Sequence, residues 1–160
     1  MKAAGLSKPT LYAHFPSKSA LLAAVLERRH QRCRIELEAW VRQVPDVRQR
    51  PLAVFGWLAD WYARDGARGC GFLNAAAELP DPEDPARRVV QAEKRWLESF
   101  LTDLCRDAGL SEPRLLGSQL LLLMDGVSGR AVVGGPRAAL DAVVDASRAA
   151  DLLTSSAAQS

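Results

Sequence analysis

The sequence predicts an all-α protein, because apolar residues recur every three or four positions along most of the chain. Proline and glycine divide it into segments with this period, and Ser or Asp stands where several of these segments begin. No segment alternates apolar and polar residues as a half-buried strand does, and no internal repeat is convincing. The expected architecture is therefore a set of packed helices.

Residues 5–18 are predicted to form a turn, a short helix and the start of a longer helix. Ser7 is a suitable N-cap, because its hydroxyl can accept from the free N–H groups of the next turn. Pro9 falls in the first turn, where its missing N–H has no consequence. Pro16 ends the short helix and Ser17 caps the next one. Such a short helix is well placed to project from a surface.

The two faces of the short helix differ in chemistry. Leu11 and Phe15 lie four residues apart and form an inward stripe. The other face carries groups that can reach phosphates and base edges: Ser7, Lys8, Thr10, Tyr12, Ala13 and His14, with Lys18 just beyond. This chemistry allows nucleic-acid binding, although short polar helices that are simply solvated have the same composition.

The run GLSKPTLYAHFPSKSALLAAVLE resembles the second half of the helix-turn-helix of TetR-type (tetracycline-repressor-like) bacterial transcriptional regulators. It shares the Gly-apolar turn, the Thr-Leu-Tyr-x-His-Phe segment, and the Ser-Lys and Leu-Leu pairs at the family's spacing. The resemblance implies base contacts from Lys8, Pro9 and Thr10. It implies contacts to the DNA backbone from Tyr12, His14 and Lys18. Ala13 departs from the pattern, because many relatives carry an aromatic residue there.

The start of the chain also departs from the family. TetR-type regulators usually have a longer segment here, which forms the first helix and most of the second, whereas residues 1–4 resemble only the last turn of that second helix. The preceding helices normally cross the DNA backbone and support the recognition helix. Without them Leu11 and Phe15 lose cover. We therefore expect Met1 to be an internal methionine of a longer chain.

The composition excludes several classes of protein. The chain has 160 residues, 48% of them hydrophobic, which is enough for one domain with a core. Its net charge of +2 gives no global attraction to nucleic acid, but Lys2, Lys8 and Lys18 precede the first acidic residue, Glu27. Basic character is thus local to the N-terminal end.

The cysteines and the apolar runs indicate a cytoplasmic protein. Cys33, Cys70 and Cys105 are an odd number at wide spacing, which argues against a disulfide framework. No signal-peptide pattern is visible. Apolar runs such as Leu120–Met124 are far shorter than the ~20 residues that a membrane-spanning helix needs.

The first long helix is predicted from Ser17 to Val44, with Pro45 at its end. At this length it spans roughly 40 Å. Its charged middle, residues 27–32, is most simply a solvated face. A second helix begins at Pro51 and ends at Gly66; Trp57 and Trp61 add an aromatic pair to its apolar face, so it is expected to be covered on two sides.

The remaining segments complete the helical pattern. A short helix is predicted over residues 70–79, and the next begins with Asp84 as N-cap and runs to about Ala108. Residues 112–134 form the most apolar segment, and 136–153 the last helix. A helix that is apolar nearly all round is either central or shared with a second subunit.

The run RGCGFLNAAAELPDPEDPAR resembles, more loosely, the C-terminal region of many actinobacterial-type members of the same family. This resemblance implies a core that binds a small molecule and dimerises through its last two helices. Three regions are therefore expected: a partial helix-turn-helix head with the connecting helix (1–44), an effector-binding and dimerisation domain (45–153), and a disordered tail (154–160).

We expect the effector pocket between the long helix and the aromatic helices. The candidate lining residues are mainly large and apolar, with one amide: Trp57, Trp61, Phe72, Asn74, Trp96, Phe100 and Met124. Each of these residues can equally serve as plain core. No cofactor or metal is expected. The expected function is a homodimeric repressor that releases a palindromic double-stranded operator when a small-molecule effector binds.

Three alternatives are less favoured. Catalysis needs a nucleophile beside an oriented base, and the only histidines are His14 and His30. A redox or metal sensor requires the three cysteines to converge, whereas a free cysteine is usually a small buried apolar residue. A dimeric small-molecule-binding module without DNA binding follows if Met1 is the true start.

Overall fold

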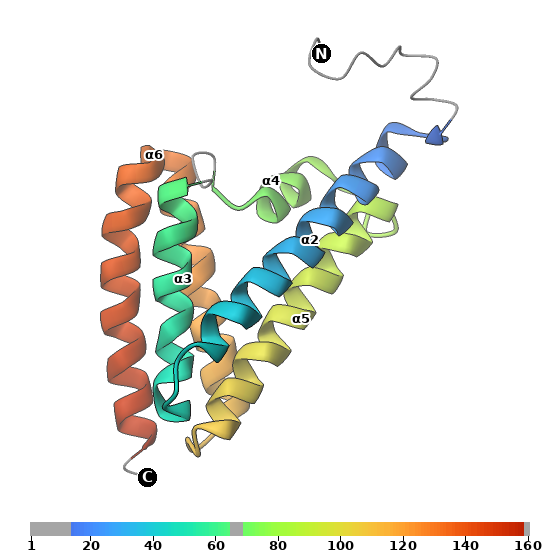
Figure 1. Cartoon of the computed structure of the whole chain (residues 1–160). Helices are drawn as coiled ribbons and strands as arrows, with labels where there is room; N and C mark the ends of the chain where they lie inside the picture. The colour runs from blue at the N-terminus through green and yellow to red at the C-terminus, as the bar shows by residue number, and fades with distance from the viewer. Residues whose placement is uncertain (1–13, 65–68, 159–160) are drawn as a thin grey trace.

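The computed structural model describes residues 14–64 and 69–158, and every regular element in these two ranges is helical (Figure 1). The expected all-α class is confirmed. The helices are α2 (Lys18–Arg42), a 3-10 turn η1 (Val47–Gln49), α3 (Arg50–Arg64), α4 (Gly71–Glu78), α5 (Pro85–Asp107) and α6 (Pro113–Ala157).

The helices form two layers. In Figure 1, α2 and α5 lie side by side as a long pair, while α3 packs with the two halves of α6. α5 also packs against α6, so it joins the two layers, and short α4 packs on α5. The first residues of α2 lie at the end of the molecule that is remote from α3 and α6.

The predicted N-caps are confirmed at two helices. The Ser17 hydroxyl accepts from the Ala20 N–H at 3.0 Å, where α2 begins. The Asp84 carboxylate accepts from the Ala86 N–H at 2.8 Å, with Pro85 in the first turn of α5. Both caps satisfy a backbone donor that has no partner within its helix, so local chemistry fixes both starts.

α6 bends sharply at the break that the sequence predicts between residues 134 and 136. Gly135 has φ +74°, a left-handed conformation that glycine adopts without strain, and Pro136 has no N–H to continue the ladder. The two halves of α6 therefore run back along each other (Figure 1).

The C-terminal residues correct one expectation. The sequence predicts a disordered tail from Thr154, but α6 continues to Ala157. Thr154 is buried and its hydroxyl donates to the Ala150 carbonyl at 3.0 Å. Ser111 donates both its N–H (3.2 Å) and its hydroxyl (2.9 Å) to the Ala157 carbonyl. These contacts hold the last turn; Gln159 and Ser160 lie outside the described residues.

The described helices enclose two apolar clusters. The large cluster extends from the second half of α2 through α3, α5 and α6. The small cluster lies at the other end of α2 and consists of Leu26, Phe72, Ala86 and Val90 with their half-buried neighbours. α5 and α6 approach closely at Gly117, where an added Cβ would come within 3.0 Å of the Thr102 backbone.

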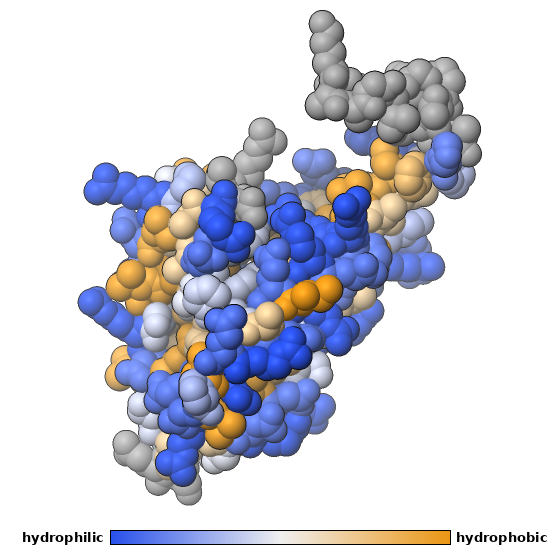
Figure 2. Space-filling model, viewed as in Figure 1, coloured by the Kyte–Doolittle hydropathy of each residue, from blue (hydrophilic) through white to orange (hydrophobic). Residues whose placement is uncertain are grey.

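The surface of α6 carries most of the exposed large apolar side chains. Figure 2 shows apolar residues gathered on the side of the molecule formed by this helix. The exposed apolar residues on α6 are Leu115, Leu122, Val132, Val133, Leu140, Val144 and Leu152. None of the helices in the described ranges has both the length and the apolar character needed to cross a membrane.

Candidate effector pocket and DNA-binding segment

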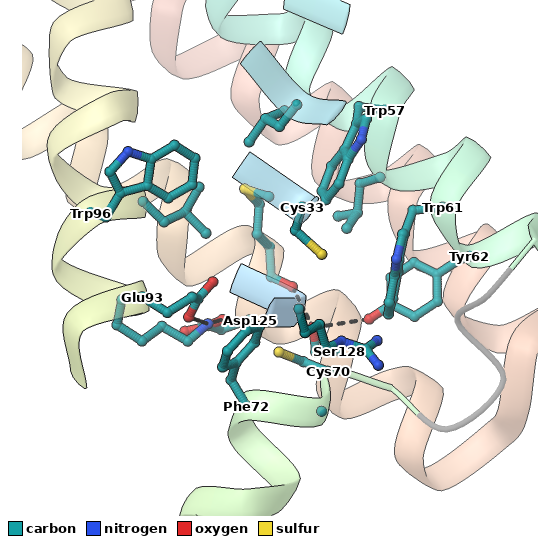
Figure 3. Close-up of a pocket in the computed structure, with 17 residues that line it drawn as sticks. Cys33, Trp57, Trp61, Tyr62, Cys70, Phe72, Glu93, Trp96, Asp125 and Ser128 are labelled. Atoms are coloured by element: carbon teal, nitrogen blue, oxygen red, sulfur yellow. Dashed lines mark hydrogen bonds and ion pairs between the residues drawn. The ribbon is translucent and has the colours of Figure 1, made fainter. Parts of the chain in front are cut away.

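A pocket with a cavity of about 60 Å³ lies where α2, α3, α4, α5 and α6 meet (Figure 3). In the close-up, Trp57, Trp61 and Tyr62 project into it from one side, and Glu93 and Trp96 from the other. The lining is mainly aromatic and aliphatic: Arg29, Cys33, Leu37, Trp57, Leu58, Trp61, Tyr62, Cys70, Gly71, Phe72, Glu93, Lys94, Trp96, Leu97, Met124, Asp125 and Ser128.

The structure brings together five of the seven residues predicted for the effector site: Trp57, Trp61, Phe72, Trp96 and Met124. Asn74 is outside the lining, because it lies two residues beyond Phe72 and successive helical residues turn by about 100°. Phe100 is also outside. It stacks on Trp96 with ring centroids 5.4 Å apart and packs against the large cluster.

The sequence predicts that the charged middle of α2, residues 27–32, is a solvated face. In the structure, two of these residues instead contact aromatic rings. The Arg29 guanidinium lies 5.4 Å from the centre of the Trp61 ring and lines the pocket. His30 contacts the edges of Trp96 and Phe72, and burial lowers its pKa. Arg29 lies three residues after Leu26 and four before Cys33, so its helical spacing already placed it on the inward face of α2.

Lys94 lies near two carboxylates of the pocket lining, but it is within hydrogen-bond distance of only one of them. Lys94 Nζ lies 2.5 Å from Asp125 Oδ1. It also lies 3.8 Å from Glu93 Oε2, which is within ion-pair range but too long for a hydrogen bond. Glu93 Oε2 is buried and has no hydrogen-bond partner among the described residues. Burial raises the pKa of Glu93 to about 7, with Lys94 lowering it and Asp125 raising it.

Two buried tryptophans also have unsatisfied donors. Trp57 Nε1 and Trp61 Nε1 lack a hydrogen-bond acceptor within the described part of the chain. In contrast, the Tyr62 hydroxyl donates to Ser128 Oγ at 2.9 Å, and that hydroxyl donates to the Met124 carbonyl at 3.2 Å. The Tyr62, Ser128 and Met124 hydrogen bonds thus form one complete chain in the pocket. Three other polar atoms of the lining, on Glu93, Trp57 and Trp61, have no hydrogen-bond partner among the described residues. Sequence reasoning missed the charged and hydroxyl groups of the pocket, because such side chains are normally solvated.

The cysteines do not form one shared site. Cys33 and Cys70 line the pocket, whereas Cys105 is packed in the large cluster. Burial raises the pKa of all three thiols, that of Cys105 to about 11, which favours the less reactive thiol form. The described residues contain no group of three His, Cys, Asp or Glu side chains arranged to hold a metal ion.

The predicted DNA-binding segment, residues 7–18, is described only in part. Ser7, Lys8, Pro9, Thr10 and Tyr12 lie outside the described residues. His14 and Lys18 are exposed, and Lys18 is the first residue of α2.

A polar contact holds the start of α2 on α5, close to that segment. Ser19 Oγ donates to Asp84 Oδ1 at 2.5 Å, and this bond holds the pKa of the Asp84 carboxyl below its usual value. Nearby, Arg87 donates to the Ala76 and Leu79 carbonyls at the end of α4. Because α4 also lines the pocket, a connected set of contacts runs from the pocket to the start of α2.

This chain is similar to one known family and to known proteins. Residues 1–25 match the family described as bacterial regulatory proteins, tetR family. The HTH-type transcriptional regulator YjdC of Escherichia coli (strain K12) is 24% identical over 132 residues, which cover 79% of this chain and 67% of that protein. The YjdC protein of Shigella flexneri matches equally.

Two solved structures have the same fold along most of the chain. A TetR-family transcriptional regulator from Streptomyces coelicolor has a TM-score of 0.83 and 29% identity, covering 94% of this chain and 79% of that chain. A protein from Streptomyces avermitilis, described as a TetR transcriptional regulator, has a TM-score of 0.69 and 34% identity, covering 94% and 84%. The fold and these matches define a helix-turn-helix transcriptional regulator. The chain belongs to the TetR family of bacterial transcriptional regulators.

Proposed function

We propose that this regulator is a homodimeric repressor that releases a palindromic operator when a small molecule enters the pocket. One observation carries the proposal: α2 begins beside the DNA-binding segment and also supplies Arg29, Cys33 and Leu37 to the pocket wall. A single continuous helix thus joins the two sites. The proposed domains are a DNA-binding head with its connecting helix (1–44) and an effector-binding and dimerisation domain (45–153), acting in the cytoplasm where the DNA lies.

The proposed DNA contacts follow from residue chemistry and from the family resemblance. Lys8, Pro9 and Thr10 contact base edges in the major groove, and Tyr12, His14 and Lys18 hold the DNA backbone. Ser7 is a further candidate DNA contact. The exposed position of Lys18 at the start of α2 supports a phosphate contact. Each phosphate-bound lysine adds affinity by releasing counterions from the duplex.

DNA selection followed by binding measurements tests this assignment. Duplexes are selected from random sequence, and affinity is measured by fluorescence anisotropy at several salt concentrations. Lys18→Ala should weaken binding to all sequences and reduce the salt slope by about 1. Thr10→Ala should relax one base position at a cost of about 1–3 kcal/mol. Arg48→Ala, in η1 near the other end of α2, is the control. Selection without an enriched sequence, or an unchanged salt slope in Lys18→Ala, contradicts the assignment.

The proposed dimer interface is the exposed apolar face of α6. Val133 is 90% exposed and Leu152 is 73% exposed, a costly arrangement for a lone chain. Pairing these faces around a twofold axis buries them. It also gives the dimer two DNA-binding heads, one for each half-site of a palindromic operator. Leu152→Glu should convert the dimer to a monomer in sedimentation equilibrium. Ile35→Glu, which changes a 65% exposed residue on α2, should leave the dimer intact. A monomeric unmodified protein contradicts the proposal.

The small size of the cavity supports coupling between the two sites. Its volume of about 60 Å³ is below the roughly 300–1,000 Å³ of typical small-molecule pockets. A ligand of ordinary size needs more room than this cavity offers, and the proposal is that α2, which forms one of its walls, moves to provide it. The ligand shifts the equilibrium only by the amount that it prefers the displaced arrangement. Displacement of α2 changes the spacing of the two heads, which lowers operator affinity.

A further inference from the structure

The pocket contains three buried polar atoms that lack partners within the described residues: Glu93 Oε2, Trp57 Nε1 and Trp61 Nε1. All three side chains line the same cavity. A buried polar atom without a hydrogen bond is costly, so native proteins rarely retain one without a reason. Their grouping at one cavity indicates that a bound molecule completes the site.

Glu93 is the group whose charge is least compensated. The other pocket carboxylate, Asp125, lies 2.5 Å from Lys94 Nζ, whereas Glu93 Oε2 is 3.8 Å from the same ammonium. The Arg29 guanidinium lies over the Trp61 ring. The Glu93 side chain is only 10% exposed. The titratable groups that line the pocket with it are Arg29 and Cys33 from α2, Tyr62 from α3, Cys70 at the start of α4, Lys94 from α5 and Asp125 from α6.

The rest of the lining suits a flat cation with an aromatic ring system. Trp57, Trp61, Tyr62, Phe72 and Trp96 supply aromatic surface around the cavity (Figure 3). Aromatic faces attract cations, and two rings of this protein already do so: Arg29 lies 5.4 Å from the Trp61 ring and Arg34 lies 5.4 Å from the Trp96 ring. Arg29 and Lys94 also line the pocket, but Lys94 is paired with Asp125 and Arg29 lies over the Trp61 ring, so Glu93 is the charge left for a ligand to compensate. A carboxylate beside aromatic walls favours an aromatic ammonium over an aromatic anion.

We propose that the pocket binds a planar, apolar amine in its protonated form, with Glu93 as the counter-ion. The proposal rests on the proposed function, because it names the chemical class of the effector for the same pocket. The ammonium donates to Glu93 Oε2, and the aromatic part of the ligand lies among the tryptophan rings. A neutral hydrocarbon leaves the carboxyl unpaired, so it binds more weakly.

Three naphthalene probes of nearly equal size and different charge test the ligand class. They are 2-naphthylmethylamine, 2-naphthalenemethanol and 2-naphthoate, and their affinity for the full chain is measured by calorimetry at pH 8 without DNA. The amine should bind at least about tenfold more tightly than the alcohol, because both donate a hydrogen bond to Glu93 but only the ammonium adds the attraction of opposite charges. The carboxylate should bind most weakly. Equal binding of amine and alcohol, preference for the carboxylate, or no binding by the amine overturns the proposal.

Two variants locate the preference. Glu93→Gln keeps the shape of the side chain and removes the charge, so it should abolish the difference between amine and alcohol. Glu98→Gln makes the same change at an exposed position of α5 and should keep it. Thermal melts by circular dichroism confirm that both variants are folded. An amine preference that survives in Glu93→Gln assigns the counter-ion elsewhere and overturns the role of Glu93.

The failure of this proposal is distinguishable from failure of the proposed function. If the protein selects a DNA sequence but does not bind the amine, the proposed ligand class is wrong and the proposed regulator function stands. If the protein binds the amine through Glu93 but selects no DNA sequence, the ligand class is correct and the proposed operator binding is wrong.

Discussion

The two ends of α2 are attached to the molecule in different ways. Towards Arg42, Leu37 and Val41 are 1% and 2% exposed and belong to the large cluster. Towards Lys18, the main attachments are Leu26 in the small cluster and the hydrogen bond from Ser19 to Asp84. Less apolar surface is buried at the end that carries the DNA-binding segment.

This difference determines which part of the molecule can move. Local opening requires least free energy where few apolar contacts must be broken. The start of α2 can therefore shift while the large cluster stays intact, and the pocket lies between the two ends. Under the proposed function, a ligand in the pocket is therefore expected to act on the weakly held end of the helix.

The largest expected effect comes from a residue of the large cluster. Leu101 is fully buried, so Leu101→Ala should lower the free energy of unfolding by about 2–5 kcal/mol. Urea unfolding followed by circular dichroism measures the loss. A loss below about 1 kcal/mol would show that the large cluster does not hold the body together.

The next effect is a dependence of stability on pH that arises in the pocket. The pKa of Glu93 is raised to about 7 in the folded protein, against about 4.3 when unfolded. The folded state therefore holds a proton that the unfolded state releases between these values. Stability should fall by on the order of 3 kcal/mol as the pH rises from about 4 to about 7.

Urea unfolding of Glu93→Gln across the same pH range is the matched measurement. The variant has no titrating carboxyl at this position, so its stability should lack this fall. Identical pH profiles for the variant and the unmodified chain would contradict the assigned pKa.

A smaller loss is expected at the weakly held end of α2. Leu26 is 4% exposed, and Leu26→Ala should cost about 2 kcal/mol, the low end of the range for a buried leucine. Hydrogen exchange should accelerate in residues 18–26 more than in residues 37–42. Leu101→Ala is the control and should accelerate exchange in both segments. Uniform acceleration in Leu26→Ala would mean that α2 opens as one unit.

The smallest effect is expected at the N-cap of α2. Ser17→Ala removes the acceptor for the Ala20 N–H and should cost about 1 kcal/mol. Ser17→Asp keeps an acceptor there and should retain the stability. Differential scanning calorimetry compares the three proteins; equal melting temperatures would mean that this cap contributes nothing.

The sequence predicts what local chemistry determines. The caps at Ser17 and Asp84 and the break at Gly135 follow from residue type and position, and the structure has all three. Aromatic residues near the pocket were predictable from their helical spacing. The continued helix at Thr154 was not, because it depends on contacts with Ser111, far away in the sequence.

The polar part of the pocket could not be predicted from the sequence for the same reason. Glu93 and Lys94 are neighbours in a charged stretch, which in most helices faces water. Only packing of α5 against α2 and α6 encloses them beside Asp125. The missing hydrogen-bond partner of Glu93 Oε2 is thus a tertiary property with no sequence signature.

One measurement tests most directly whether the pocket controls the DNA-binding end. The affinity for a selected duplex is followed by fluorescence anisotropy while 2-naphthylmethylamine is added to the unmodified chain and to Glu93→Gln. The predicted result is a loss of DNA affinity in the unmodified chain and little change in the variant. Unchanged DNA affinity at concentrations where calorimetry shows the pocket to be full would contradict the coupling.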